Sequence, residues 1–175
     1  LVVNTTGTHN TAVGYEALQS HTEGIYNTAV GYHALAADTT GHSNAALGYL
    51  AGASITTGTG HTAIGKGALN AVTGSVHALT AVGRDALAAN TSGANNVAVG
   101  AYSMDANTTG GNTTAVGYSA LGIQTTGSDN VAVGYSSMGS TTTAYSSTAV
   151  GALSLTANTE GNANAAFGYR SMYTN

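Results

Sequence analysis

Apolar and small residues recur along this chain with a period of 17 residues. A phrase that usually begins with asparagine and always contains alanine, one branched or aromatic apolar residue and then glycine returns ten times. We call the final glycines of the phrase the anchor glycines: Gly14, Gly31, Gly48, Gly65, Gly83, Gly100, Gly117, Gly134, Gly151 and Gly168. Every spacing between them is 17, except the 18 residues from Gly65 to Gly83. A register held this strictly indicates a repeat architecture rather than disorder.

Each repeat is predicted to form a short strand, a turn, a second short strand and a second turn. The first strand covers the apolar pair before the anchor, such as Ala12 and Val13, and the second covers pairs such as Ala17 and Leu18. A second glycine, seven residues before most anchors, can supply a turn with positive φ. Helical repeats are longer and need a helical stripe, which these units lack. We therefore predict an all-β fold, a parallel β-solenoid (β-roll) of ten 17-residue coils, as a single domain over residues 1–175.

Both faces of the predicted strands are apolar. Successive residues of a strand point to opposite faces, yet Ala12 and Val13 are both apolar, as are their equivalents in other repeats. A strand that is apolar on both faces is normally buried on both faces. One face can fill the coil interior, while the other needs a second layer that so short a coil cannot supply. Because alanine would let a partner backbone approach closely, we expect a closed homo-oligomer packed along its whole length.

Composition narrows the classes of function. Only three residues, Lys66, Arg84 and Arg170, carry a permanent positive charge, and the net charge is −4, so nucleic acids and anionic membranes are disfavoured as partners. No apolar run reaches the roughly 20 residues needed to span a bilayer, which predicts no membrane insertion. The absence of cysteine excludes disulfides and thiolate metal sites. Because the chain starts without methionine and keeps its composition to both ends, we expect it to be a segment of a longer fibre.

The repeated phrases resemble those of known surface fibres. The phrase Asn-x-Ala-x-Gly, as in residues 10–14 and 130–134, is similar to the head repeats of trimeric autotransporter adhesins. The longer phrase Thr-Ala-Val-Gly-Tyr-x-Ala-Leu, in residues 11–18, resembles phage tail-fibre repeats more closely. The resemblance covers nearly the whole chain and implies a left-handed homotrimer that is extracellular or on a virion surface and binds a host glycan or protein. Adhesin heads usually have a shorter repeat, followed by a neck and a coiled coil that are missing here, which favours the tail-fibre reading.

The segments and residues that resemble catalytic or metal-binding motifs are better explained by their positions in the repeat. Residues 60–67 differ from a phosphate-binding P-loop by one residue, but Gly65 is an anchor glycine and Gly67 stands where a Ser or Thr would hold magnesium. The acids are scattered, so they form no expected acid–base or calcium pair and are read as surface residues. We predict no enzyme activity, no cofactor and no metal. The histidines occupy different positions in their repeats, apart from the pair His42 and His77; the six are His9, His21, His33, His42, His61 and His77.

One row of residues is a candidate for recognition, and it directly follows the anchor glycines. We call this row the tyrosine stripe: Tyr15, Tyr32, Tyr49, Lys66, Arg84, Tyr118, Tyr135 and Tyr169. Neighbouring rings should lie about one coil apart, within the stacking range of aromatic pairs. If exposed, the stripe could bind glycans or another surface. Alternatively it is a structural ladder, in which Lys66 and Arg84 make cation–π contacts to Tyr49.

Two further features of the sequence are structural predictions. The asparagines four residues before the anchors should form an amide ladder from coil to coil. Residues 69–82, which contain the extra residue, should form a bulged loop. Three functions follow as alternatives: a fibre segment that positions or contributes to host binding, an adhesin whose wall binds host protein or glycan, and a monomeric ice-binding solenoid. The third is suggested by the many threonines, although Thr is absent from the position beside the repeated alanine in four of ten repeats.

Overall fold

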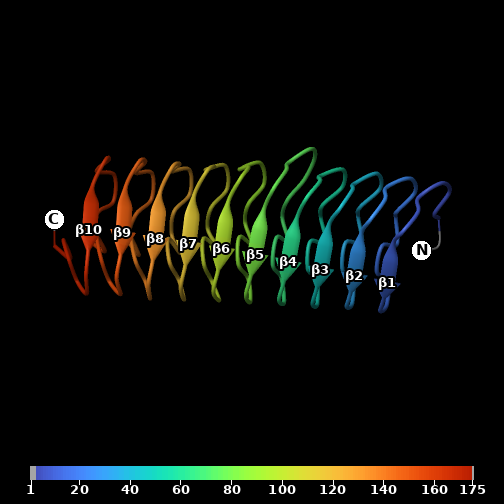
Figure 1. Ribbon diagram of the computed structural model, residues 1–175, viewed down its shortest axis with the longest axis horizontal. Helices are drawn as coiled ribbons and strands as arrows, with labels where there is room; N and C mark the ends of the chain where they lie inside the picture. Colours follow the sequence, from blue (N-terminus) through green and yellow to red (C-terminus); the bar gives the residue numbers. More distant parts are fainter. Residues whose placement is uncertain (1–2, 175) are drawn as a thin grey trace.

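The protein is a parallel β-solenoid with one short strand in each coil. The computed structural model describes residues 3–174, and in this range it has ten strands and no helix. The strands are β1 (Thr11–Val13), β2 (Thr28–Val30), β3 (Ala45–Leu47), β4 (Thr62–Ile64), β5 (Thr80–Val82), β6 (Val97–Val99), β7 (Thr114–Val116), β8 (Val131–Val133), β9 (Thr148–Val150) and β10 (Ala165–Phe167). They form one sheet in chain order, and equivalent residues pair in parallel register. The predicted fold class is confirmed, with the chain ends at opposite ends of a rod (Figure 1).

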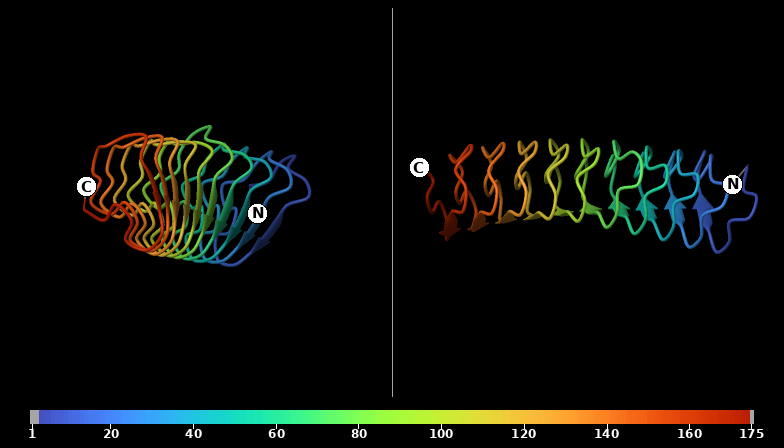
Figure 2. Two further views of the ribbon diagram at one scale, coloured as in Figure 1. Left: turned by 60° about the vertical axis from the view of Figure 1, so that its left-hand side comes forward. Right: turned by 90° about the horizontal axis from the view of Figure 1, so that it is seen from above.

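Hydrogen bonds connect each coil to the coils before and after it. We count a coil from four residues before one anchor glycine, so coil 1 is residues 10–26 and coil 4 is residues 61–78. The backbone N–H of Thr11 donates to the carbonyl of Asn27 in the next coil, at 2.8 Å. In the opposite direction, the N–H of His33 donates to the carbonyl of Tyr15, at 2.9 Å. The strands consequently lie side by side along one side of the rod (Figure 2).

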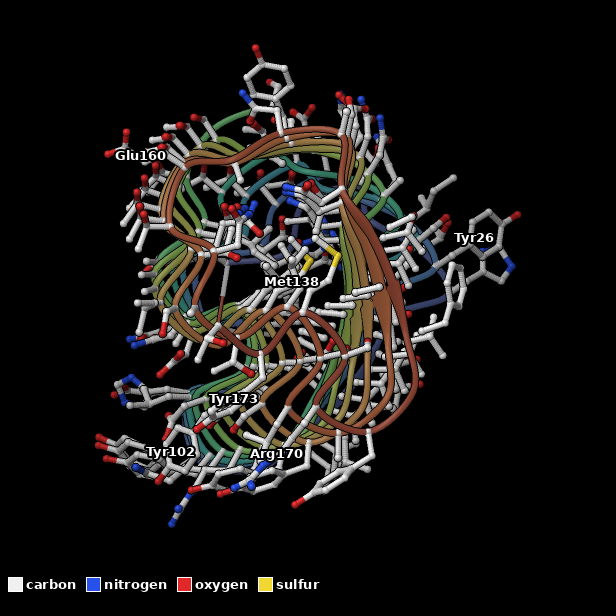
Figure 3. All side chains as sticks on the ribbon, turned by 90° about the vertical axis from the view of Figure 1, so that its left-hand side faces the viewer. Tyr26, Tyr102, Met138, Glu160, Arg170 and Tyr173 are labelled. Atoms are coloured by element: carbon white, nitrogen blue, oxygen red, sulfur yellow. The ribbon has the colours of Figure 1, made fainter. Side chains whose placement is uncertain are left out.

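The interior of the rod is filled by small and apolar side chains from every coil. The alanine of each strand points inward, and Ala98 and Ala115 are fully buried. Met138 lies in the middle of the cross-section (Figure 3), and it belongs to the same buried core cluster as Leu121 and Leu155. The expectation that a partner chain packs against the alanine row was therefore wrong. Its own coil buries the alanine, and the outward apolar residue is the one after it.

The second apolar pair of each repeat forms a turn, so the prediction of a second strand was wrong. Leu18 and Leu35 have φ angles of 51° and 50°, in the left-handed region. This conformation interrupts the alternation of a strand, and Ala17 and Leu18 are both buried as a result. Two neighbouring apolar residues at this place therefore both point into the same core, because the backbone turns there.

The anchor glycines are required by conformation and by space. Their φ angles lie between 109° for Gly168 and 142° for Gly48, a region that residues with a Cβ rarely occupy. A Cβ at Gly14 would also collide with the carbonyl of Gly31 in the next coil. Close stacking of coils at this corner explains why the sequence allows no other residue there.

Two rows of polar side chains join the coils. In the asparagine ladder, formed by the residues four before each anchor, Asn27 Oδ1 accepts the backbone N–H of Asn44 at 2.9 Å. The Asn27 amide donates to the carbonyl of Gly41 at 2.7 Å. The predicted ladder is confirmed, but its bonds run to backbone groups rather than between amides. A threonine ladder, eight residues after the anchors, was missed: in it Thr22 Oγ1 donates to the carbonyl of Thr39 at 3.0 Å.

Coil 4 holds the predicted irregular loop. Its 18 residues include Thr73, Gly74 and Ser75, which are exposed, and Gly74 has a φ of 72°. The connection between β4 and β5 rises above the neighbouring loops in Figure 1. The pairing of β4 with β5 stays in register, because the extra residue is absorbed in this loop.

Candidate functional site

The tyrosine stripe lies on the surface at the corner that follows each strand. Tyr15 and Tyr135 are 62% and 56% exposed, and Tyr32, Tyr49 and Tyr118 are exposed as well. The corner exists because the anchor glycine turns the chain sharply and directs the next side chain into solvent. The structure therefore places the stripe where a large partner could reach it.

The rings of the stripe stack on one another in two groups. Tyr32 lies between Tyr15 and Tyr49, with ring centroids 5.3 and 5.2 Å apart and planes tilted by 10°. Tyr118 and Tyr135 stack in the same way at 5.7 Å. The predicted ladder is confirmed for these pairs. Because the ring faces contact each other, the stripe presents ring edges and phenol hydroxyls to solvent rather than open aromatic faces.

The cationic middle of the stripe differs from the prediction. The guanidinium of Arg84 lies over the ring of Tyr102, 4.5 Å from its centroid, and not over Tyr49. Tyr102 stands one position later in its repeat than the stripe, so a search by fixed position missed it. Beside Tyr102, the ring of Tyr118 is edge-on at 5.7 Å. Arg84 and Tyr102 thus lie beside the second tyrosine group, and Figure 3 shows Tyr102 pointing outward.

The first tyrosine group carries a histidine and an acid. The ring of His33 stacks on Tyr32, with centroids 4.2 Å apart, and its Nε2 lies 2.6 Å from Glu16 Oε2. A hydrogen bond with the Glu16 carboxylate raises the pKa of the Tyr15 phenol. At the other end of the stripe, the guanidinium of Arg170 lies 5.4 Å from the ring centroid of exposed Tyr169. The stripe is therefore polar at its edges as well as aromatic.

A second exposed surface is the outer face of the sheet. It consists of the first and third residues of every strand, and these are Thr, Ala, Val, Leu, Ile or Phe without exception. Val13, Leu47 and Phe167 are exposed on this face. Twenty positions in ten coils thus form a continuous surface without a charge. A sheet face that contacts only water would not need to exclude charged residues.

Two histidines are buried inside the coils. His21 Nδ1 lies 2.8 Å from Asp38 Oδ2, and both side chains are fully buried, so the assignment of all acids to the surface was wrong for Asp38. Burial raises the pKa of Asp38 against the opposing effect of His21. Burial also lowers the pKa of His61 to about 4. The sequence could not reveal either environment, since both histidines stand in positions that hold different residues in other repeats.

The P-loop-like segment forms ordinary parts of a coil. Thr62–Ile64 is strand β4, and the anchor Gly65 and the exposed Lys66 follow it in a turn. Within residues 3–174, no group of three or more His, Asp or Glu side chains gathers as a metal site would. The same range has no helix long and apolar enough to cross a membrane.

Fold and surface together define the class of the chain as a parallel β-solenoid with one aromatic stripe and one uncharged sheet face. Comparison with family models, with curated protein sequences and with solved structures found no significant match.

Proposed function

We propose that the chain is a structural and adhesive segment of a homotrimeric surface fibre, of the phage tail-fibre type. The observation that carries the proposal is the uncharged outer sheet face, which continues through all ten strands. In this role the rod holds a binding tip away from its base, and its own wall contributes to attachment at a host surface.

A second copy of the chain is the partner that fits the outer sheet face best. With strands about 4.8 Å apart, the face is about 45 Å long. A copy has the same axial period, so its rows of Val and Thr can match coil by coil over this whole length. Burial of such a row removes apolar area from water along the entire rod, and a closed assembly leaves none of it exposed. The number of three rests on the resemblance of the repeats to trimeric fibres.

Side-on attachment would use the tyrosine stripe. Its rings are fixed by stacking, so little side-chain entropy is lost when a partner binds. Phenol hydroxyls and the Arg84 guanidinium, repeated about one coil apart, suit a host glycan or protein that offers many weak hydrogen bonds. Multivalent contact along the rod would then give useful avidity. An adhesin whose wall is the main binding surface is the alternative form of the same proposal.

The oligomeric state in solution tests the assembly. We expect light scattering at micromolar concentration to give three times the mass of one chain. Val116→Lys, which places a charge on the outer sheet face of β7, should reduce the mass toward the monomer, because an unpaired charge would be buried in the contact. Thr126→Lys is the matched control, since Thr126 lies in an exposed turn of the same coil, and its mass should stay trimeric.

A folded, monomeric parent would overturn the assembly, and so would a Val116→Lys variant that remains trimeric. The ice-binding alternative predicts that monomer, because Thr28 and other outward threonines share the exposed sheet face with valine. Ice-recrystallisation inhibition by the monomer, lost in Val116→Lys, would support this alternative in place of a fibre.

A further inference from the structure

The asparagine ladder changes at coil 4 and breaks at coil 5. His61 stands in the ladder and accepts the backbone N–H of Leu79 through Nδ1, at 3.3 Å. Leu79 occupies the next place and has no polar side-chain atom to offer, whereas Asn96 in the following coil resumes the pattern by accepting the N–H of Thr113 at 3.0 Å. The ladder is therefore divided into two sections that meet at coils 4 and 5.

The threonine ladder is interrupted at the same place. Thr39 Oγ1 donates to the carbonyl of Thr56 at 3.0 Å, and Thr91 Oγ1 donates to that of Thr108 at 3.1 Å. Between them, Thr56 Oγ1 instead accepts the backbone N–H of Gly74 at 3.1 Å. The extra residue of coil 4 shifts the loop, so the hydroxyl of Thr56 no longer meets a threonine carbonyl.

Two backbone bonds in the loop region of coil 4 are long, while the bonds of its strand and first turn have ordinary lengths. The N–H of Thr73 lies 3.4 Å from the carbonyl of Thr91, while the equivalent bond from Thr108 to Thr125 is 2.8 Å. The bond from the N–H of Asn95 to the carbonyl of His77 is also 3.4 Å. Longer bonds of this kind are weaker, so the loop of coil 4 is held less firmly than the equivalent loops of the regular coils.

His61 is buried in coil 4 without an acidic partner that could stabilise its charge. In coil 6, the amides of Asn96 and Asn107 both donate to the carbonyl of Gly110. The same positions of coil 4 hold His61 and the apolar Val72. His61 Nε2 faces the carbonyl of Val76 but lacks the geometry of a hydrogen bond.

Burial and, to a smaller extent, His77 oppose the protonation of His61, while the carbonyl of Val76 favours it. Asn44 in coil 3 and Leu79 in coil 5 are uncharged, and His77 in coil 4 is the titratable group that acts on it. Burial lowers the pKa of His61 from about 6.5 to about 4. The unfolded coil therefore binds a proton that the folded coil does not, and stability is lost as the pH falls from about 6.5 to about 4.

We propose that coil 4 is an acid-labile joint of the rod, which opens on mild acidification through protonation of His61 while the coils on both sides stay folded. Each coil contacts only its neighbours, so one coil can open without unfolding the whole solenoid. In a fibre, the joint would let a rod that is stiff at neutral pH bend in an acidic compartment. This inference concerns the coil itself and holds for a monomer as well as a trimer.

Hydrogen exchange at about pH 7 and about pH 5, corrected for intrinsic rates, tests the joint. Protection of the amides in residues 62–79 should fall about 20-fold at the lower pH, which follows from the two pKa values of His61. Amides of residues 131–147, in a stretch without histidine, should keep their protection.

His61→Asn is the decisive variant, because asparagine is the common residue of this ladder, and it should abolish the acid-induced loss. His42→Asn, at an exposed histidine of coil 2 in the same position of its repeat as His77, is the control and should retain that loss. Equal loss of protection in both stretches of the parent, or none in residues 62–79, would overturn the proposal even if His61→Asn failed to fold. So would an unchanged response in a folded His61→Asn variant.

Discussion

Left-handed backbone conformations outside glycine are the main local requirement of this fold. Leu18, Tyr26 and His33 have φ angles between 51° and 62°, and equivalent residues of the other coils do the same. Each such residue costs about 1 kcal/mol relative to glycine, because its Cβ approaches a backbone oxygen. Side chains remain at these positions where they fill the interior or extend the surface, and the strain is distributed over the rod.

Exchanging alanine and glycine at one of these positions should therefore change stability in opposite directions. Ala163 and Gly60 occupy the same place in their coils, with φ angles of 55° and 72°, and both are exposed. Ala163→Gly should raise the free energy of unfolding by about 0.5–1 kcal/mol, and Gly60→Ala should lower it by a similar amount. Denaturant unfolding measures both. A destabilised Ala163→Gly variant would show that the strain argument fails.

Prediction from the sequence succeeded at positions where one residue type has a single structural role. The anchor glycines could be placed because no other residue occurs there, and the asparagine ladder because asparagine holds its position in six of ten coils. The turn at Leu18 could not be predicted, because an apolar leucine next to an alanine is typical of a strand and its left-handed backbone conformation is not visible in the sequence. Asp38 was also missed, because its burial depends on a contact with His21 from the preceding coil.

At the level of the element, a three-residue strand with alternating faces determines both surfaces of the sheet. In β6, Ala98 is fully buried and its two neighbours in the strand are half-buried on the outer face. The period of 17 and the alternation along a strand predicted the strand before each anchor and its alanine row, together with a second strand that is a turn in the structure. They could not decide which row faces inward, because both are apolar and a second chain could have covered either.

Substitutions in two rows distinguish the inner face from the surface. Ala98→Asp should abolish folding or solubility, because a carboxylate buried among alanines costs several kcal/mol. Tyr135→Ala removes one stacked ring, so the free energy of unfolding should fall by no more than about 1 kcal/mol, with the oligomeric mass unchanged. Circular dichroism and light scattering measure both. If Ala98→Asp folded normally while Tyr135→Ala fell apart, the two rows would have to exchange roles.

On the scale of the whole molecule, the rod behaves as a one-dimensional stack. Contacts between strands connect only consecutive coils, so stability is a sum of coil and interface contributions. The sequence predicted this from its period alone. It also predicted the irregular loop of coil 4, but not the two long hydrogen bonds or the buried environment of His61, which are not visible in the repeat.

Removing one complete period should be tolerated better than removing a small part of one. Deletion of residues 131–147 joins Asn130 to Thr148 in register, and we expect a folded rod with slightly lower thermal stability. Deletion of the four residues 139–142 leaves a coil too short to close, and should cause a much larger loss. Thermal unfolding followed by circular dichroism measures the difference. The stacking description would be contradicted if the longer deletion were the more damaging one.

The chain ends lie at opposite ends of the rod, which matters when a fibre is pulled. Tension applied at the ends passes through each interface between coils in series, so every interface carries the same load. The force at which the rod extends is then set by its weakest interface, however strong the others are. With two long bonds and interrupted ladders next to coil 4, elongation under load is expected to begin at this coil, and the three coils before it and the six after it would move apart as intact blocks.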